Sequence, residues 1–206
     1  AGAGVDTIDV EAATARGIAV MNAPDGNTLA AAEHALSLLF ALARHVPRAD
    51  AGMKAGEWPK AGLTGFELEG KKLGVVGLGR IGSTVARKAR GLGMDVAAYD
   101  PFLPPSAAAH GSVPLKSFDE LLAWADVVTL HIPRTKDTTR LLNAGTLARM
   151  KRGACLVNAA RGGLVDEAAL LEALDSGQLA GAALDTFATE PLPADSPLRA
   201  HPKLVL

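Results

Sequence analysis

Residues 73–82 read Leu-Gly-Val-Val-Gly-Leu-Gly-Arg-Ile-Gly, an apolar run that leads into three closely spaced glycines. The first part of this run, Lys72–Val76, has the composition of a short buried strand. The segment that follows, Arg80–Ala89, has the apolar spacing of a helix. The sequence therefore predicts a strand, a glycine turn and a helix in direct succession.

Each glycine of this turn is expected to have a separate role. Gly77 permits the tight turn, Gly79 leaves no side chain between the main chain and a bound pyrophosphate, and Gly82 lets the helix pack closely on the strand. The free N–H groups and the dipole of the helix attract the anion. Asp100 lies 18 residues beyond Gly82, at the end of a second expected strand, Asp95–Tyr99. A carboxylate there accepts hydrogen bonds from a ribose diol, so the whole pattern predicts dinucleotide binding.

Asp100 also indicates which dinucleotide is bound. An ionised carboxylate repels a 2′-phosphate, and the segment Pro101–Pro104 offers no arginine to receive one. NAD is therefore favoured over NADP as the cofactor.

Composition narrows the remaining classes. The chain has 206 residues, of which 49% are hydrophobic, and a net charge of −1, so there is no electrostatic reason to expect nucleic acid or an anionic membrane as partner. The single cysteine, Cys155, excludes a disulfide within the chain and is expected to be a buried structural thiol in a cytoplasmic protein. No cysteine pair or histidine spacing indicates a metal site. The apolar segment Thr28–Ala43 is shorter than the ~20 residues of a membrane-spanning helix, and we expect it to be buried against its own domain and a second subunit.

Beyond the glycine turn, short β-rich runs alternate with helical patterns, which predicts an α/β fold with a doubly wound parallel sheet, that is, a Rossmann-like nucleotide-binding domain. The further strands are expected at 125–130, 154–158, 180–184 and 203–206, and the further helices at 118–124, 144–150 and 167–176. Ligands of such sheets bind at the carboxyl ends of the strands.

The first 24 residues differ in kind from the rest. We expect a helix at Val10–Arg16, a strand at Ile18–Met21 and a turn at Pro24–Asn27. The domain boundaries predicted here are 1–24 for a remnant of another, substrate-binding domain and 25–206 for the nucleotide-binding domain. The chain is expected to be truncated at both ends.

Several residues at the expected strand ends are suited to chemistry. Arg161, held by Gly162-Gly163, either grips a carboxylate through two parallel hydrogen bonds or is a surface arginine in a turn. Glu190 either orients a histidine or is simply solvated, and Asp185 either accepts a hydrogen bond from a nicotinamide amide or caps a turn. His131 is a candidate base, although its neighbours suggest that its loop shapes the cofactor pocket. The histidines expected to be structural or exposed are His34, His45, His110 and His201.

Taken together, these motifs resemble the D-isomer-specific 2-hydroxyacid dehydrogenases, and within them most closely the D-3-phosphoglycerate dehydrogenase branch. The resemblance runs along essentially the whole chain. Its segments are Gly4-Val5-Asp6, Glu11-Ala12-Ala13, Asn22-Ala23-Pro24, Gly77–Gly82, Leu130–Pro133, Asn158–Glu167, Gly181–Asp185 and Glu190-Pro191.

The resemblance implies roles for individual residues. Arg161 would bind the substrate carboxylate, and Glu190 would support the catalytic histidine. The apolar helix from Thr28 matches the dimerisation arm of the family, which implies a homodimer. The residues implied to contact NAD are Gly77, Gly79, Arg80, Ile81, Gly82, Asp100, Ile132, Thr138, Ala159 and Asp185, with Ala3 near the nicotinamide end.

Two regions of the family pattern lie outside this sequence. The catalytic histidine of the family belongs to a Pro-His-x-Gly segment beyond Leu206, and the first substrate-binding region, with its basic residues, precedes Ala1. We therefore expect a fragment that binds NAD but is inactive by itself.

The implied reaction is oxidation of a D-2-hydroxy acid, most closely D-3-phosphoglycerate in serine biosynthesis. The enzyme alternatives are a glyoxylate, hydroxypyruvate or D-lactate reductase of the same family; a formate dehydrogenase fits less well, because that branch carries Gln where this chain has Glu190. A short-chain dehydrogenase is excluded, since Tyr99 lacks the lysine four residues later. An alternative of a different class is an NAD-responsive dimer that resembles transcriptional corepressors.

Overall fold

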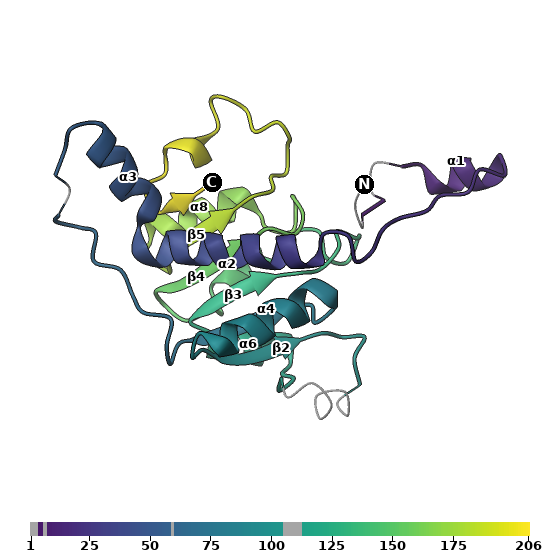
Figure 1. Cartoon of the computed structure of the whole chain (residues 1–206), viewed down its shortest axis with the longest axis horizontal. Helices are drawn as coiled ribbons and strands as arrows, with labels where there is room; N and C mark the ends of the chain where they lie inside the picture. Colours follow the sequence, from purple (N-terminus) through teal and green to yellow (C-terminus); the bar gives the residue numbers. More distant parts are fainter. Residues whose placement is uncertain (1–3, 6–7, 59, 105–112) are drawn as a thin grey trace.

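The structure is a computed structural model of the chain, and it describes residues 4–5, 8–58, 60–104 and 113–206. A parallel sheet of six strands, in the order β2-β1-β3-β4-β5-β6, forms its centre (Figure 1). The strands are β1 Lys72–Val76, β2 Asp95–Tyr99, β3 Val127–Leu130, β4 Ala154–Asn158, β5 Leu179–Leu184 and β6 Leu204–Val205. An isolated parallel bridge pairs Ala98 of β2 with Leu115, which lies outside the six strands. The predicted doubly wound α/β fold is thus confirmed.

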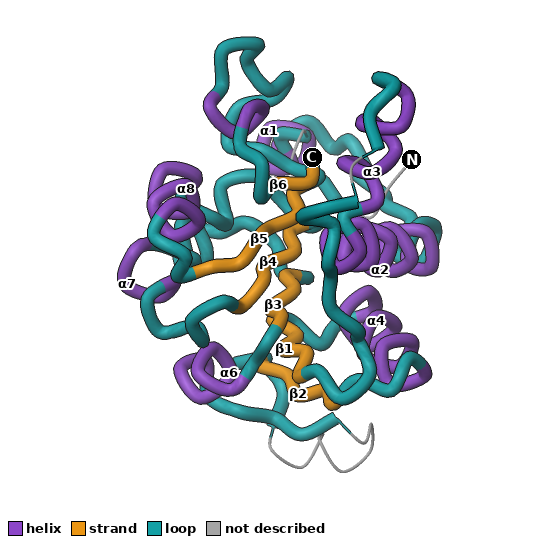
Figure 2. Tube along the Cα trace, turned by 90° about the vertical axis from the view of Figure 1, so that its left-hand side faces the viewer, coloured by secondary structure: helices purple, strands orange, loops and turns teal. Residues whose placement is uncertain are grey.

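Helices cover both faces of the sheet (Figure 2). On one face lie α2 and α4, and on the other lie α6, α7 and α8. The helices are α1 Val10–Ala15, α2 Thr28–Arg44, α3 Val46–Lys54, α4 Arg80–Gly91, α6 Phe118–Trp124, α7 Ala144–Leu147 and α8 Glu167–Asp175, with a 3₁₀ helix at Pro197–Ala200. This arrangement leaves the carboxyl ends of the strands at one edge of the sheet, between the two helical layers.

The order of the strands reverses beside β1. The chain passes from β1 through α4 to β2 on one side, and then returns to β3 on the other side of β1. Crossovers that leave a strand in opposite directions open a crevice at its carboxyl end, where ligands of such sheets bind. The register aligns these ends, because Val76 pairs with both Tyr99 and Leu130.

The core has two halves, one on each face of the sheet. Val75 belongs to the half beneath α2 and α4, whereas its neighbour Val76 belongs to the half beneath α6 and α8. All five residues of β4 are buried, as expected for a parallel strand covered on both faces. Cys155 in this strand is 3% exposed, and burial raises the pKa of its thiol to about 11, so the thiol stays protonated.

The long helix α2 is the apolar segment that begins at Thr28. Its buried side chains are Ala32, Ala35, Leu36, Leu38, Leu39, Leu42 and Ala43. Leu29 and Phe40 on the same helix remain exposed at 59% and 41%. Within the described residues, no single helix is long and apolar enough to cross a membrane, although α2 and α3 pass that criterion as a pair bent by 65°.

Several predicted bounds differ from the observed ones. No strand forms at Ile18–Met21, where the side chains of Ile18 and Met21 are 57% and 88% exposed. A strand requires a partner, and this segment lies apart from the sheet with α1 (Figure 1). The strand expected at 203–206 is reduced to β6, and the helix expected at 144–150 ends at Leu147.

Candidate functional site

The carboxyl ends of five strands meet along one edge of the sheet. Gly77 follows β1, Asp100 follows β2, His131 follows β3, the segment 159–161 follows β4, and Asp185 follows β5. Main-chain hydrogen bonds continue past the strands and hold these positions in line. They run from Gly77 N to Tyr99 O at 2.8 Å, from His131 N to Val76 O at 2.8 Å and from Asp185 N to Asn158 O at 3.0 Å. The topology therefore gathers residues that are far apart in the sequence, as predicted.

Two glycines of the turn are required by the protein's own main chain. Gly77 has a φ of +90°, and a Cβ atom there would lie 2.6 Å from both His131 O and Ile132 Cγ2. A Cβ atom on Gly82 would lie 1.9 Å from Gly77 O. These contacts bring the start of α4 directly against the end of β1.

Gly79 behaves differently from its neighbours. Among the described residues, no heavy atom beyond Gly79 and its two chain neighbours lies within 4 Å of the position that a Cβ would take, so Gly79 faces open space. It is also the N-cap of α4, and in the described part of the chain no side chain caps it. The first N–H groups of a helix carry a partial positive charge, and here they face a space that a side chain would fill. The turn therefore fits a diphosphate.

Asp100 is fixed by two main-chain donors. Leu78 N donates to its Oδ2 at 2.9 Å, and Phe102 N donates to its Oδ1 at 3.0 Å. The carboxylate thus lies directly beside the glycine turn. Each carboxylate oxygen accepts more than one hydrogen bond, so this half-buried group has capacity left for the hydroxyls of a ribose.

The loop that follows β3 packs against the glycine turn at Gly77. Ile132 contacts the turn at Gly77, as described above. Thr138 braces the loop, because its hydroxyl donates to Pro133 O at 2.8 Å and accepts from Thr135 N at 2.7 Å. His131 forms a hydrogen bond of 3.0 Å between its Nε2 and the hydroxyl of Thr129. Burial lowers the pKa of His131 to about 4, so it is neutral at physiological pH. This group is therefore a weak base there.

The loop after β4 carries Arg161. Asn158 folds this loop, because its Nδ2 donates to Arg161 O at 3.0 Å and its Oδ1 accepts from Ala160 N at 3.1 Å. A Cβ atom on Gly162 would lie 1.7 Å from Phe187 O. Gly162 thus allows the Arg161 loop to press against the segment that follows β5. The half-buried guanidinium donates from Nη1 to Ala160 O at 2.7 Å.

The segment after β5 supplies the other candidates. Glu190 is exposed, and its Oε1 accepts from Phe187 N at 2.9 Å. Asp185 forms an ion pair with His34 of α2, with 3.0 Å between its Oδ1 and the histidine Nε2. Sequence reasoning assigned both residues separately and missed this pairing. The hydroxyl of Thr186 is buried, and it has no hydrogen-bond partner among the described residues.

The remaining predicted contacts lie around the turn. Arg80 Nε lies 2.8 Å from Asp25 Oδ1, so this side chain points to the segment before α2. Ile81 and Ala159 are half-buried against the core beneath α2 and α4. Ala3 lies outside the described residues. The carboxyl ends of the strands therefore bring together Asp100, the loop of Arg161 and Asp185, whereas the Arg80 side chain is paired with Asp25.

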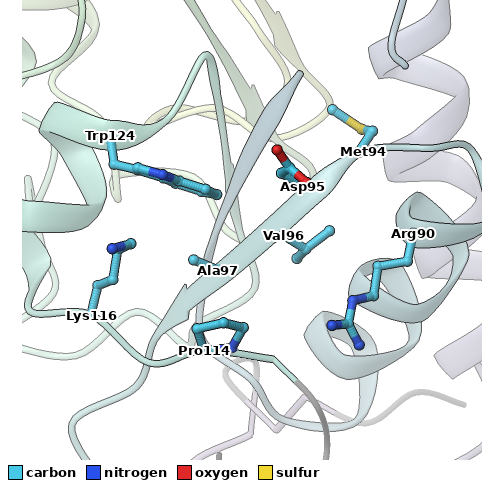
Figure 3. Close-up of a pocket in the computed structure, with 8 residues that line it drawn as sticks. All are labelled: Arg90, Met94, Asp95, Val96, Ala97, Pro114, Lys116 and Trp124. Atoms are coloured by element: carbon cyan, nitrogen blue, oxygen red, sulfur yellow. The ribbon is translucent and has the colours of Figure 1, made fainter. Parts of the chain in front are cut away.

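A separate cavity of about 370 Å³ lies at the outer edge of β2 (Figure 3). Trp124 and Lys116 line one side of it and Arg90 lies on the other. Asp95 opens β2 and also lines the cavity, whereas Asp100 follows the opposite end of the strand. This cavity is therefore distinct from the strand-end site. No group of three or more metal-ligating side chains occurs among the described residues.

A doubly wound sheet, a glycine turn that opens into a helix, and an acidic residue after the second strand define a dinucleotide-binding domain of the Rossmann type. The chain belongs to the D-isomer specific 2-hydroxyacid dehydrogenase family, because residues 36–206 match the NAD binding domain of that family. The cofactor of this domain is therefore NAD, as predicted.

Curated proteins similar in sequence to this chain carry names that fit this family. The chain is 50% identical over 205 residues to a D-3-phosphoglycerate dehydrogenase of Bacillus subtilis, covering 100% of this chain and 39% of the relative. It is 52% identical over 198 residues to a D-3-phosphoglycerate dehydrogenase of Archaeoglobus fulgidus, covering 96% of this chain and 38% of the relative. The chain thus spans about two fifths of the length of these relatives.

Solved structures show the same architecture. The TT0316 protein from Thermus thermophilus superposes with a TM-score of 0.91 at 46% identity, over 99% of this chain and 65% of that one. An NAD-dependent formate dehydrogenase from Staphylococcus aureus, solved in complex with NAD, gives a TM-score of 0.88 at 36% identity, over 99% of this chain and 61% of that one.

Proposed function

We propose that this chain is the coenzyme-binding part of an enzyme that oxidises a D-2-hydroxy acid to the 2-oxo acid. The proposed substrate is D-3-phosphoglycerate, and the proposed role is in serine biosynthesis. This choice is supported by relatives that are about 50% identical to this chain and are named D-3-phosphoglycerate dehydrogenase. The observation that carries the proposal is the row of strand ends, which brings the glycine turn, Asp100 and the loop of Arg161 to one edge of the sheet.

The coenzyme side of the site is proposed as follows. The N–H groups at the start of α4, at Arg80 and Ile81, hold the diphosphate beside Gly79. Asp100 accepts hydrogen bonds from the adenosine ribose, and Asp185 accepts one from the nicotinamide carboxamide. The contacts assigned to the walls of this pocket are Ala3, Gly77, Gly82, Ile132, Thr138 and Ala159. When bound, NAD supplies the acceptor for the hydride.

The substrate side has two proposed residues. Arg161 binds the substrate carboxylate, because a guanidinium in a folded loop presents its donors in a fixed plane. This fixes the orientation of the hydroxy-bearing carbon. Glu190 hydrogen-bonds to the catalytic histidine of the Pro-His-x-Gly segment, and a carboxylate partner keeps an imidazole basic enough to take the hydroxyl proton. Both residues lie on loops joined by the close contact between Gly162 and Phe187.

Three finer assignments complete the proposal. Leu29 and Phe40 of α2 remain exposed although the other leucines of α2 are buried, which supports a homodimer through this helix. Residues 1–24 are proposed to belong to a substrate-binding domain, since α1 has no buried residue. A cytoplasmic location is proposed from the single buried thiol of Cys155.

The experiment measures NADH formation by the complete gene product with NAD and a panel of D-2-hydroxy acids and their L-enantiomers. We expect the highest kcat/KM with D-3-phosphoglycerate and negligible turnover of the L-enantiomers. Higher kcat/KM with D-lactate, or faster reduction of glyoxylate or hydroxypyruvate with NADH, would assign one of the related reductases instead. NAD-dependent dimerisation without any turnover would contradict an enzymatic role and favour a corepressor-like dimer.

A further inference from the structure

The carboxylate of Asp185 does not stand alone at the end of β5. Its Oδ1 lies 3.0 Å from Nε2 of His34, which belongs to α2 on the face of the sheet. Both side chains are about half exposed, at 48% for His34 and 50% for Asp185. The pair therefore lies at the surface of the strand-end site, where a ligand can reach it.

The path of α2 explains why these two residues meet. Gly181 of β5 lies directly beneath Leu42, since a Cβ atom on Gly181 would be 2.8 Å from Leu42 Cδ1. From Leu42 back to His34 the helix covers about 12 Å at its usual rise. From Gly181 forward to Asp185 the strand covers about 13 Å. The helix and the strand run in opposite directions, so these matched lengths bring His34 opposite Asp185.

The pair fixes one half of the carboxylate and leaves the other half for a ligand. The main chain of Asp185 is held by the bond from its N to Asn158 O at 3.0 Å. Nε2 of His34 lies beside this side chain, 3.0 Å from Oδ1, and limits where the carboxylate can turn. Among the described residues, the structure gives Oδ2 no hydrogen-bond donor. A carboxylate held at one oxygen presents the other oxygen in a defined direction, which suits it to accept from an amide.

We propose that His34 is a positioning residue that orients Asp185 toward the nicotinamide carboxamide of the coenzyme. This inference rests on the proposed function, in which Asp185 faces the nicotinamide. It assigns to α2, the proposed dimer helix, a direct influence on the nicotinamide half of the site. Among the described residues, no hydrogen bond or ion pair joins His34 to the glycine turn or to Asp100, which are proposed to hold the other half of the coenzyme.

The test compares the affinities of NADH and ADP-ribose by isothermal titration calorimetry. ADP-ribose contains the adenosine and diphosphate but lacks the nicotinamide. We expect His34→Ala to weaken NADH by about fivefold, the effect of losing one polar contact at a half-exposed site, and to leave the affinity for ADP-ribose unchanged. We expect His34→Gln to restore the NADH affinity, because its amide nitrogen can take the place of Nε2 beside Oδ1 of Asp185.

The matched control is Glu33→Ala on the same helix. This change breaks the ion pair of 2.9 Å between Glu33 and Lys88 of α4 and does not touch Asp185. We expect it to leave both affinities unchanged. In an Asp185→Ala background, His34→Ala should cause no further loss, since the residue it positions is absent.

The outcomes separate this inference from the proposed function. Equal weakening of NADH and ADP-ribose by His34→Ala would show a general structural effect and overturn the positioning role, as would unchanged affinity for NADH. If Asp185→Ala itself leaves the affinity for NADH unchanged, the proposed contact to the nicotinamide is wrong. If the unaltered protein binds neither ligand, the proposed function fails as a whole.

Discussion

We predict that the charge of Asp100 selects the coenzyme, so Asp100→Asn should change the preference for NAD over NADP. In the unaltered protein, one carboxylate oxygen of Asp100 accepts from Leu78 N and the other accepts from Phe102 N. Asparagine keeps one oxygen acceptor and replaces the other oxygen by an amide nitrogen, so one of these two hydrogen bonds is lost. Loss of a charge-assisted hydrogen bond to the ribose costs about 1.5 kcal/mol, or about tenfold in affinity for NAD.

The same substitution removes a repulsion from the 2′-phosphate of NADP. Two like charges about 4 Å apart repel by about 4 kcal/mol at the effective dielectric of a protein surface. Asp100 is half-buried, so solvent screening reduces this figure, and we take about 1.5 kcal/mol. NADP should therefore bind about tenfold more tightly, and the ratio of the two affinities should change by about a hundredfold.

Calorimetric titration of both coenzymes measures this ratio. The ratio is the informative quantity, because loss of a bond to Leu78 N disturbs the glycine turn and weakens both coenzymes alike. Asp95→Asn is the matched control, since this exposed residue opens the same strand at its far end. If Asp100→Asn weakens both coenzymes and leaves their ratio within about twofold of its original value, the carboxylate supports the turn and does not select the coenzyme.

Three further outcomes are expected. In the complete gene product, Arg161→Ala should lower kcat/KM at least a hundredfold with little change in NAD affinity, and an equal loss of both in steady-state kinetics and calorimetry would indicate a structural role. Gly162→Ala should destabilise the fold by about 3 kcal/mol or more in urea denaturation, because its Cβ would lie 1.7 Å from Phe187 O, whereas Gly91→Ala, with open space at the same position, should be neutral or slightly stabilising. The pKa of His131 is lowered to about 4 in the folded protein, so on acidification the unfolded state binds a proton on this histidine before the folded state does. The free energy of unfolding should therefore fall by about 2–3 kcal/mol between pH ~6.5 and pH ~4 in urea denaturation, and His131→Gln should reduce this fall.

The elements with strong local signals were predictable from the sequence. The bounds expected for β1, β2, β4 and α6 agree with the observed ones. The strands are short apolar runs between turn residues, which is typical of strands buried on both faces. Helix α6 has a capping box, in which Ser117 Oγ accepts from Glu120 N at 3.3 Å and Glu120 Oε2 accepts from Ser117 N at 2.9 Å. Local interactions of this kind determine where an element begins.

Elements whose existence depends on tertiary contacts were not predictable. The apolar segment Ile18–Met21 has strand composition but no strand beside it, so it forms none. Helix α3 was missed, although Pro47 in its first turn is typical of a helix start. His45 lies between α2 and α3 and adopts a left-handed backbone conformation with a φ of 52°. The apolar spacing of α2 does not reveal this break or the helix that follows it.

The same distinction applies within the candidate site. All strands of a parallel sheet point the same way, so a sequence in which strand ends are located also predicts which residues share the crevice. It does not predict how those residues pair. Asp100 accepts hydrogen bonds from Phe102 N of its own turn and from Leu78 N of the glycine turn, so the placement of this proposed ribose ligand follows from local chain geometry. Asp185 finds its partner on α2, and that contact exists only because Gly181 lets the helix lie close to β5. The placement of Asp185, the proposed nicotinamide contact, therefore depends on helix packing, and changes in α2 are expected to act on Asp185 while Asp100 stays in place.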